Sequence, residues 1–256
     1  MAKKKSNLFF KYLLLIILIL IIIYYLQEDI IEAEKISEKT TIYKDGFKVW
    51  NLNYKNKPNM NTLIKKLKNL SKKELGPDYI FLDYRYHLKG CSVSTFHRDI
   101  TSNKTTYKTK YPTYTALIYN YAGNYFSVCP NSHKTYPFAF ERPLSIVGKG
   151  KALVIFDGDL LHAGMINNVG NKRDFMQFKI VHKDDLKKLI DLNKINVKKE
   201  NICNNSYTLE LFLRKLSYLF AFFINFFSSL FVKKEKSGIK KHIQNLFPFL
   251  NYYNNN

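Results

Sequence analysis

The stretch that most constrains the fold runs from residue 79 to residue 182 and reads as a succession of short strands. Its segments are rich in β-branched and aromatic residues and are separated by Gly, Asn, Pro or Ser. The predicted strands are 79–87, 92–97, 113–121, 125–129, 152–156 and 175–182. Because no helical pattern separates these strands, they predict an antiparallel sandwich or barrel. We therefore expect a mainly β domain with helices on its flanks.

Within this stretch, His97 and Asp99 are two residues apart, the spacing that places side chains on one face of an extended strand. Two imidazoles and one carboxylate can hold a non-haem Fe(II) and leave positions open for a co-substrate and O2. The third ligand must come from another strand, and His162 lies far enough downstream to supply it. The sequence therefore predicts a catalytic metal site made of His97, Asp99 and His162.

The motifs around these residues resemble the phytanoyl-CoA dioxygenase family of Fe(II)/2-oxoglutarate oxygenases. In that family's order they read Phe96-His97-Arg98-Asp99, Pro130-Asn131-Ser132-His133-Lys134, the strand 150–156, Leu161-His162-Ala163-Gly164, Asn167 and Arg173. Asn131 and Lys151 depart from the Gly and Asp usual there. The resemblance covers the middle third to half of the chain. It implies a double-stranded β-helix, a cupin-like jelly-roll, that binds Fe(II) and 2-oxoglutarate and uses O2.

The same resemblance assigns one carboxylate of 2-oxoglutarate to a cation shortly after His162. Arg173 follows at the interval used in this family. The tail 169–172 also resembles the prolyl and lysyl hydroxylases, which place the cation one residue earlier, at Lys172. A guanidinium can bind a carboxylate through two parallel hydrogen bonds, whereas an ammonium is a point charge. Arg173 is therefore favoured as the cofactor-binding residue, and Lys172 stays open as the alternative.

An apolar run near the N-terminus, 8–26, predicts a membrane anchor. It follows Lys3, Lys4 and Lys5 and would form a helix roughly 28 Å long, close to the thickness of a bilayer's hydrocarbon core. Lysines precede the run and acidic residues follow it, so the positive-inside rule places the N-terminus in the cytoplasm. A cleaved signal peptide is the alternative, but the run is long and lacks a small-residue cleavage site. We expect a single-pass membrane protein.

Helical patterns flank the predicted β domain. Apolar residues recur at helical spacing over 61–75, and a helix is predicted over 184–194, where acidic residues favour its N-terminus. A second apolar run, 216–232, crosses the membrane, lies at its surface or covers the domain. The expected organisation is a Lys-rich tip and anchor at 1–27, a linker at 28–59 with one short element at 47–52, the oxygenase domain at 60–200, and a membrane-associated helix with a Lys/Asn-rich tail at 201–256.

The charge of the chain, formally +21, does not by itself indicate a nucleic-acid partner. The lysines are scattered, and no helix-turn-helix, zinc-finger or RNA-binding signature accompanies them, so no nucleic acid is expected. The cysteines, Cys91, Cys129 and Cys203, lack Cys-x-x-Cys spacing, which argues against zinc. Cys91 and Cys129 could pair if the domain faces an oxidising lumen.

Together these features predict a membrane-anchored Fe(II)/2-oxoglutarate-dependent dioxygenase that hydroxylates an unactivated C–H bond. The anchor is compatible with a lipid or small-molecule substrate. The likeness to prolyl and lysyl hydroxylases is compatible with a protein side chain as the substrate. The alternative is a catalytically silent jelly-roll that serves as a membrane-anchored binding or structural protein. Fe(II)-dependent conversion of 2-oxoglutarate to succinate would separate the two.

Overall fold

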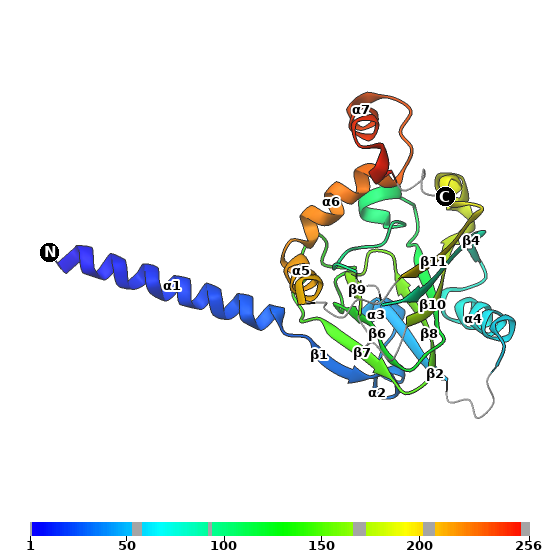
Figure 1. The fold of residues 1–256 in the computed structure, drawn as a ribbon, viewed down its shortest axis with the longest axis horizontal. Coiled ribbons are helices and arrows are strands. Elements are labelled where there is room, and N and C mark those ends of the chain that lie inside the picture. The colour runs from blue at the N-terminus through cyan, green and yellow to red at the C-terminus, as the bar shows by residue number, and fades with distance from the viewer. Residues whose placement is uncertain (1, 53–57, 92–93, 166–172, 202–207, 252–256) are drawn as a thin grey trace.

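The computed structural model describes residues 2–52, 58–91, 94–165, 173–201 and 208–251. Two β-sheets with helices around them form the body of the molecule, and one long helix projects from it (Figure 1). The strands are β1 (Asp29–Glu32), β2 (Phe47–Leu52), β3 (Tyr79–Phe81), β4 (Tyr84–Gly90), β5 (Tyr114–Tyr119), β6 (Gly123–Val128), β7 (Leu144–Gly148), β8 (Lys151–Asp157), β9 (His162–Gly164), β10 (Arg173–His182) and β11 (Ile195–Asn201). The helices are α1 (Ala2–Leu26), α2 (Ala33–Ser37), α3 (Ile42–Asp45), α4 (Met60–Leu75), η1 (Asn103–Tyr107), η2 (Lys183–Leu192), α5 (Thr208–Leu219), α6 (Ala221–Val232), α7 (Gly238–Leu246) and η3 (Pro248–Leu250).

The smaller sheet has four strands in the order β1-β7-β6-β9. The larger has seven, in the order β11-β4-β10-β5-β8-β2, with β3 beside β10. Most neighbours are antiparallel, whereas β1 with β7 and β11 with β4 are parallel. The prediction of a mainly β fold with flanking helices is confirmed, and the two sheets are consistent with the expected jelly-roll.

Alternation along the central strands explains why the larger sheet is apolar on both faces. In β8, Val154 and Phe156 pack in the core shared with the smaller sheet, while Leu153 and Ile155 pack on the outer face. The buried leucines of α4 cover that outer face. A strand buried on both faces needs apolar residues on both, so the polar alternation of a half-exposed strand is absent. The helix predicted at 61–75 is confirmed as α4.

Several boundaries differ from the predictions. The segment 28–59 is expected to be a linker with one short element at 47–52. That element is β2, which pairs with β8, but the segment also contributes β1, which pairs with β7. The strand expected at 92–97 is reduced, within its described residues, to a bridging pair at His97. The helix expected at 184–194 is the 3₁₀ helix η2, and β7 and β11 had no predicted counterpart. β1, β2 and β11 lie at sheet edges, where tertiary pairing selects a conformation that local sequence specifies weakly.

Apolar helices lie outside the β body. α1 projects away from it, and its large apolar side chains between Phe9 and Tyr24 are mostly exposed (Figure 1). Among the described residues, no single helix combines the length and the apolar character needed to cross a membrane. The run at 216–232 is broken between α5 and α6, which are bent by 95° and meet that criterion only as a pair.

The cysteines do not pair as considered from the sequence. Cys129 is buried and free, whereas Cys91 is disulfide-bonded, so the two are not joined to each other. Cys129 packs instead beside Phe96 and Tyr218, and burial raises the pKa of its thiol to about 11. Cys203 lies outside the described residues. The Cys91–Cys129 pairing is therefore wrong.

Candidate metal centre

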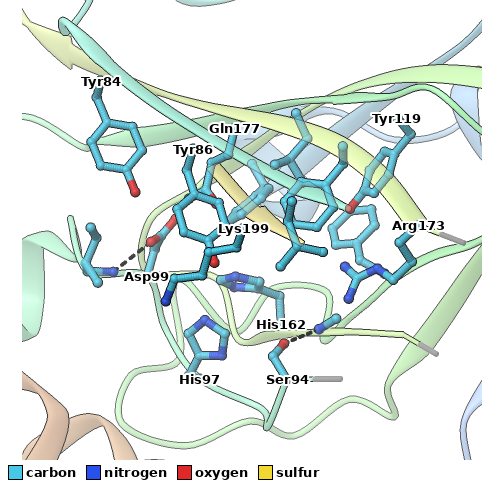
Figure 2. Close-up of a pocket in the computed structure, with 17 residues that line it drawn as sticks. Tyr84, Tyr86, Ser94, His97, Asp99, Tyr119, His162, Arg173, Gln177 and Lys199 are labelled. Atoms are coloured by element: carbon cyan, nitrogen blue, oxygen red, sulfur yellow. Dashed lines mark hydrogen bonds between the residues drawn. The ribbon is translucent and has the colours of Figure 1, made fainter. Parts of the chain in front are cut away.

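A cavity of about 290 Å³ lies between strands of the two sheets, and the predicted site residues form part of its wall (Figure 2). His97, Asp99, His162 and Arg173 all line it. The other lining residues are Tyr84, Tyr86, Leu88, Ser94, Ile100, Leu117, Tyr119, Phe126, Phe156, Gly164, Phe175, Gln177 and Lys199. The fold therefore brings four side chains that are distant in sequence to one mostly apolar chamber.

Backbone pairing places the two histidines side by side. His162 opens β9, and His97 forms an isolated antiparallel bridge with it. The N–H of His97 donates to the carbonyl of His162 at 2.9 Å, and the reverse hydrogen bond is 3.0 Å long. Opposed residues of an antiparallel pair project to the same side, which brings the two ring centroids to 4.5 Å from each other. Because metal–nitrogen bonds are about 2 Å long, both rings can reach one ion.

Each imidazole is also oriented by a backbone carbonyl two residues earlier. Nδ1 of His97 lies 2.7 Å from the carbonyl oxygen of Thr95, and Nδ1 of His162 lies 2.9 Å from that of Leu160. A carbonyl can only accept, so Nδ1 carries the proton and the lone pair is on Nε2. Burial, followed by the neighbouring His97, lowers the pKa of His162 to about 3. His162 is therefore a neutral imidazole, the form that binds metals.

Asp99 is buried and faces a lysine. Its Oδ2 lies 2.5 Å from Nζ of Lys179 and also accepts a hydrogen bond from the hydroxyl of Thr115. Its Oδ1 accepts from the N–H of Ile100 at 2.7 Å. Burial alone would raise the pKa of Asp99, but Lys179 and His162 more than offset this, so the pKa lies well below its usual range. The carboxylate is ionised and already has a cationic partner.

Lys179 is the functional neighbour that the sequence reading missed. Arg173, Phe175 and Gln177 alternate along β10 and line the cavity, and Lys179 is the next residue on that face. It is fully buried, donates to Thr115 Oγ1 at 2.9 Å and lies over the ring of Tyr84. A lysine within an apolar strand, on the same face as the candidate Arg, was the available signal.

Arg173 lines the cavity on the other side of the imidazole pair from Asp99 (Figure 2). Its guanidinium lies over the ring of Phe175, with 4.8 Å between the guanidinium carbon and the ring centroid. It also packs against Gly164, where a Cβ would lie 2.8 Å from Nη1 of Arg173 and 2.9 Å from Oγ of Ser94. Gly164 therefore makes room for the guanidinium. Lys172, the alternative cation, lies outside the described residues.

Other polar residues of the candidate motifs have structural partners. His133 lies 3.4 Å from the carbonyl of Tyr43, and burial lowers its pKa to about 4. The side chain of Asp159 accepts from Ser102, and the guanidinium of Arg98 donates to backbone carbonyls. In the described part of the chain these side chains do not contribute to the wall of the cavity.

The residue types fit a non-haem Fe(II) site, for which two neutral imidazoles and one carboxylate are the expected donors. The imidazoles fit as they stand. The carboxylate is engaged by Lys179, and no group of three or more His, Cys, Asp or Glu side chains within the described ranges is arranged to hold a metal. Because a divalent cation and an ammonium are both attracted to this carboxylate, Lys179 would compete with a metal for Asp99. The assignment of these residues as ligands stays a prediction.

No protein-family model matches the chain, and no curated protein matches it. Solved structures with a similar fold include apo HygX from Streptomyces hygroscopicus, at a TM-score of 0.40 and 14% identity over 56% of this chain and 84% of that one. The non-heme alpha ketoglutarate dependent epimerase SnoN from nogalamycin biosynthesis has a TM-score of 0.42 and 10% identity, over 59% of this chain and 80% of that one. EctD from S. alaskensis in its apoform has a TM-score of 0.42 and 14% identity, over 57% of this chain and 76% of that one. At such values no ligand or reaction of this chain follows from the likeness.

Proposed function

We propose that this protein is an Fe(II)- and 2-oxoglutarate-dependent oxygenase that hydroxylates an unactivated C–H bond. One observation carries the proposal: His97 and His162, from distant parts of the chain, lie ring to ring in a cavity that also holds Arg173, and each Nδ1 faces a carbonyl. Metal-binding histidines usually donate a hydrogen bond from the N–H of their second ring nitrogen to such a partner, which fixes the ring and leaves the other nitrogen for the metal.

His97, Asp99 and His162 would hold the iron, which with bound 2-oxoglutarate supplies the oxidising chemistry that activates O2. Arg173 binds the far carboxylate of 2-oxoglutarate through its two parallel N–H donors. Gly164 supports this role, because any side chain there would push into the guanidinium. Lys179 neutralises Asp99 inside the apolar core until the metal replaces it.

The aromatic wall keeps water from the reacting centre. Phe156 packs on His162 with 4.4 Å between ring centroids, and Phe126 and Phe175 line the same chamber. A dry chamber favours transfer of oxygen to the substrate over side reactions with solvent. The substrate is a lipid, another small molecule or a protein side chain.

We further propose that α1 tethers the protein to a membrane, with the N-terminus in the cytoplasm. Support comes from its exposed apolar side chains and from its projection away from the domain, which leaves the helix without a protein core to bury it (Figure 1). Lysines at the start of the helix and acidic residues after it favour this orientation.

The second candidate is a catalytically silent, membrane-anchored binding or structural protein. It is favoured by one observation, the ion pair between Asp99 and Lys179, which satisfies the carboxylate without a metal. A fold that kept this pair permanently would have two imidazoles and no third ligand.

The test measures Fe(II)-dependent conversion of 2-oxoglutarate to succinate by the full chain, with calorimetric titration of Mn(II) as a second readout. We expect turnover in wild type and none in His162→Ala, with Mn(II) affinity lowered by more than about 100-fold, beyond the usual effect of losing an outer partner of a ligand. His242→Ala, at an exposed position on α7, is the matched control. A folded, metal-loaded wild type without turnover would establish the silent alternative.

The same assay decides between Arg173 and Lys172. Arg173→Ala is expected to raise the KM for 2-oxoglutarate by about 100-fold, because two charge-assisted hydrogen bonds are lost. Lys172→Ala should leave the KM close to wild type. The reverse result would transfer the carboxylate-binding role to Lys172.

A further inference from the structure

The polarity of α6 is the reverse of what a helix on a water-soluble protein shows. Its buried residues are Ala221, Asn225 and Val232, which recur at helical spacing on one face. The phenylalanines lie on the other side and are 41–58% exposed: Phe222, Phe223, Phe226 and Phe227. α4 shows the ordinary arrangement, with Leu63 and Leu67 buried and lysines outside. The outer face of α6 is therefore suited to a non-aqueous surrounding.

This face continues onto α5 and towards α1. α5 exposes further large apolar side chains, Leu209, Leu211, Phe212, Leu213 and Leu219, and Phe220 at the bend is also exposed. Glu28, just after α1, is bound by Arg214 of α5, which also donates to the carbonyl of Gly164 at 3.0 Å. α1 therefore joins the domain beside α5, and the apolar helices lie on one side of it (Figure 1). We call residues 208–232 the α5–α6 elbow.

The border of the elbow is positively charged. Exposed lysines lie on α5, after α6 and on α7: Lys215, Lys233, Lys234, Lys236 and Lys240. Over 208–250 the chain has seven Lys and Arg but only Glu210 and Glu235 as acids. An apolar face edged by lysines matches an anionic bilayer, whose headgroups attract cations at the depth where the acyl chains begin.

The inner side of the elbow reaches the candidate metal centre. A second cavity, of about 190 Å³, lies beneath α6 between Asn225 and Ser228 on the helix and the segment that carries His97 and Asp99. His97 and Asp99 line both this cavity and the main one. Asn225 accepts from the backbone N–H of Arg98 at 2.6 Å, so α6 is fixed directly beside the histidine.

We propose that the α5–α6 elbow docks into the surface of a bilayer rich in anionic phospholipid, and that the substrate is an amphiphile resident in that bilayer which reaches the metal centre beneath α6. The substrate part rests on the proposed function. In it, one oxygen atom of O2 enters a C–H bond of the amphiphile to give C–OH, and the other enters the succinate formed as 2-oxoglutarate loses CO2.

Docking is tested by tryptophan fluorescence in the full chain with Trp50→Phe as background. Phe226→Trp reports on the elbow, and Ile190→Trp on η2, an exposed apolar position outside it, is the control. In vesicles containing phosphatidylserine and brominated acyl chains, we expect emission at 226 to fall to about half and emission at 190 to stay unchanged. Without phosphatidylserine, the loss at 226 should shrink by about twofold.

The docking would be overturned by equal changes in tryptophan emission at 226 and 190. It would also be overturned by a loss of emission at 226 that is the same with and without phosphatidylserine. The docking would also be overturned if the tryptophan at 226 were shielded from water in the absence of vesicles and the protein had twice the mass of one chain in solution. A second copy would then cover the elbow. If the tryptophan variants do not fold, the unmodified chain is labelled in vesicles that contain a photoactivatable phospholipid. Labelled peptides from 208–232 support the proposal, and labelling confined to α1 contradicts it.

The substrate class is tested by mass spectrometry of the vesicle lipids after incubation with Fe(II), 2-oxoglutarate and O2. A lipid that gains one oxygen atom in wild type and not in His162→Ala supports the proposal. Succinate formation that depends on His162, without any oxidised lipid, overturns the substrate class and leaves the proposed function intact. Quenching at residue 226 without succinate formation overturns the proposed function and leaves the docking intact.

Discussion

Two buried carboxylates near β5 are held in opposite ways. Asp99 is 6% exposed and its Oδ2 lies beside Lys179, whereas Asp157 is 7% exposed and its Oδ1 accepts a hydrogen bond from the backbone N–H of Asp159, at 2.8 Å. The pKa of Asp99 is well below its usual range because of the lysine, but burial raises that of Asp157 to about 7. An ionised carboxylate on the cavity wall can serve a metal, while a protonated one outside it cannot. The partner of the carboxylate, more than its burial, decides its role.

The largest effect is expected from removing the lysine. In Lys179→Met the carboxylate of Asp99 is left buried without its cation, which should cost about 3–5 kcal/mol of unfolding free energy in metal-free buffer. A divalent metal can replace the lost charge, so Mn(II) should stabilise this variant more than it stabilises wild type. Denaturant unfolding with and without Mn(II) measures both effects.

Lys199→Met is the matched control, because Lys199 lines the same cavity but is exposed. Its stability and its response to Mn(II) should be those of wild type. If Mn(II) stabilised Lys179→Met no more than wild type, Asp99 would not be a ligand, and the contrast with Asp157 would lose its functional meaning.

The second effect concerns the pH dependence of stability through Asp157. In the folded state the carboxyl of Asp157 has a pKa of about 7, whereas in the unfolded chain it has its ordinary pKa of 3.8. The unfolded state therefore binds fewer protons in this window, and stability falls as the pH rises from about 4 to about 7. Asp157→Asn removes this dependence, and should gain about 2–4 kcal/mol relative to wild type across the window.

Unfolding of wild type and Asp157→Asn in chelator-treated buffer at several pH values provides the measurement. The asparagine keeps an oxygen that can accept from the N–H of Asp159. The comparison of the two proteins therefore measures the effect of the titratable proton alone. Parallel profiles for the two proteins would mean that Asp157 is ionised in the fold.

The sequence predicted the parts of the site that local rules govern. Periodicity predicted α4, while the spacing of His97 and Asp99 together with the family resemblance predicted that these two residues and His162 lie close together. The contact between Asp99 and Lys179 did not follow, because it joins segments 80 residues apart in sequence. β10 has apolar residues on both of its faces, so alternation did not show which face points inward and did not mark Lys179 as a neighbour of Asp99.

An edge strand and the break in the C-terminal apolar run were not predicted, for a similar reason. β1 is selected by its pairing with β7, which the local sequence does not record, whereas the short element expected at 47–52 is β2. The run 216–232 is uniformly apolar, so hydropathy alone gives one long element, yet Arg214, Ser217 and Asn225 bond to the β domain on both sides of the bend. Tertiary contacts rather than propensity therefore place the break.

The third effect compares the two carboxylates as metal ligands. Asp99→Asn in the Lys179→Met background removes both charges of the pair, an exchange that buried ion pairs often tolerate. We expect it to lower Mn(II) affinity by about 100-fold relative to Lys179→Met alone, because a charged ligand is lost. Asp157→Asn should leave the affinity unchanged. Calorimetric titration at pH 7 decides, and an equal loss in both variants would remove the distinction between them.

The smallest effect separates two threonines next to these carboxylates. Thr115 donates to Asp99 and accepts from Lys179, whereas Thr113 donates to the carbonyl of Thr101 on the side of Gly158. Each change to Val removes a buried hydrogen-bonding hydroxyl and should cost about 1–2 kcal/mol of stability. In Thr115→Val the lysine is also held less firmly on the carboxylate, so stabilisation by Mn(II) should increase.

Thr113→Val provides the control, since it should show the same loss of stability with the Mn(II) response of wild type. Thermal unfolding with and without Mn(II) measures the difference between the two variants. An increase confined to Thr115→Val means that Lys179 and the metal compete for one carboxylate. Equal responses mean that the ion pair is a permanent part of the core, and then the two histidines lack their third ligand.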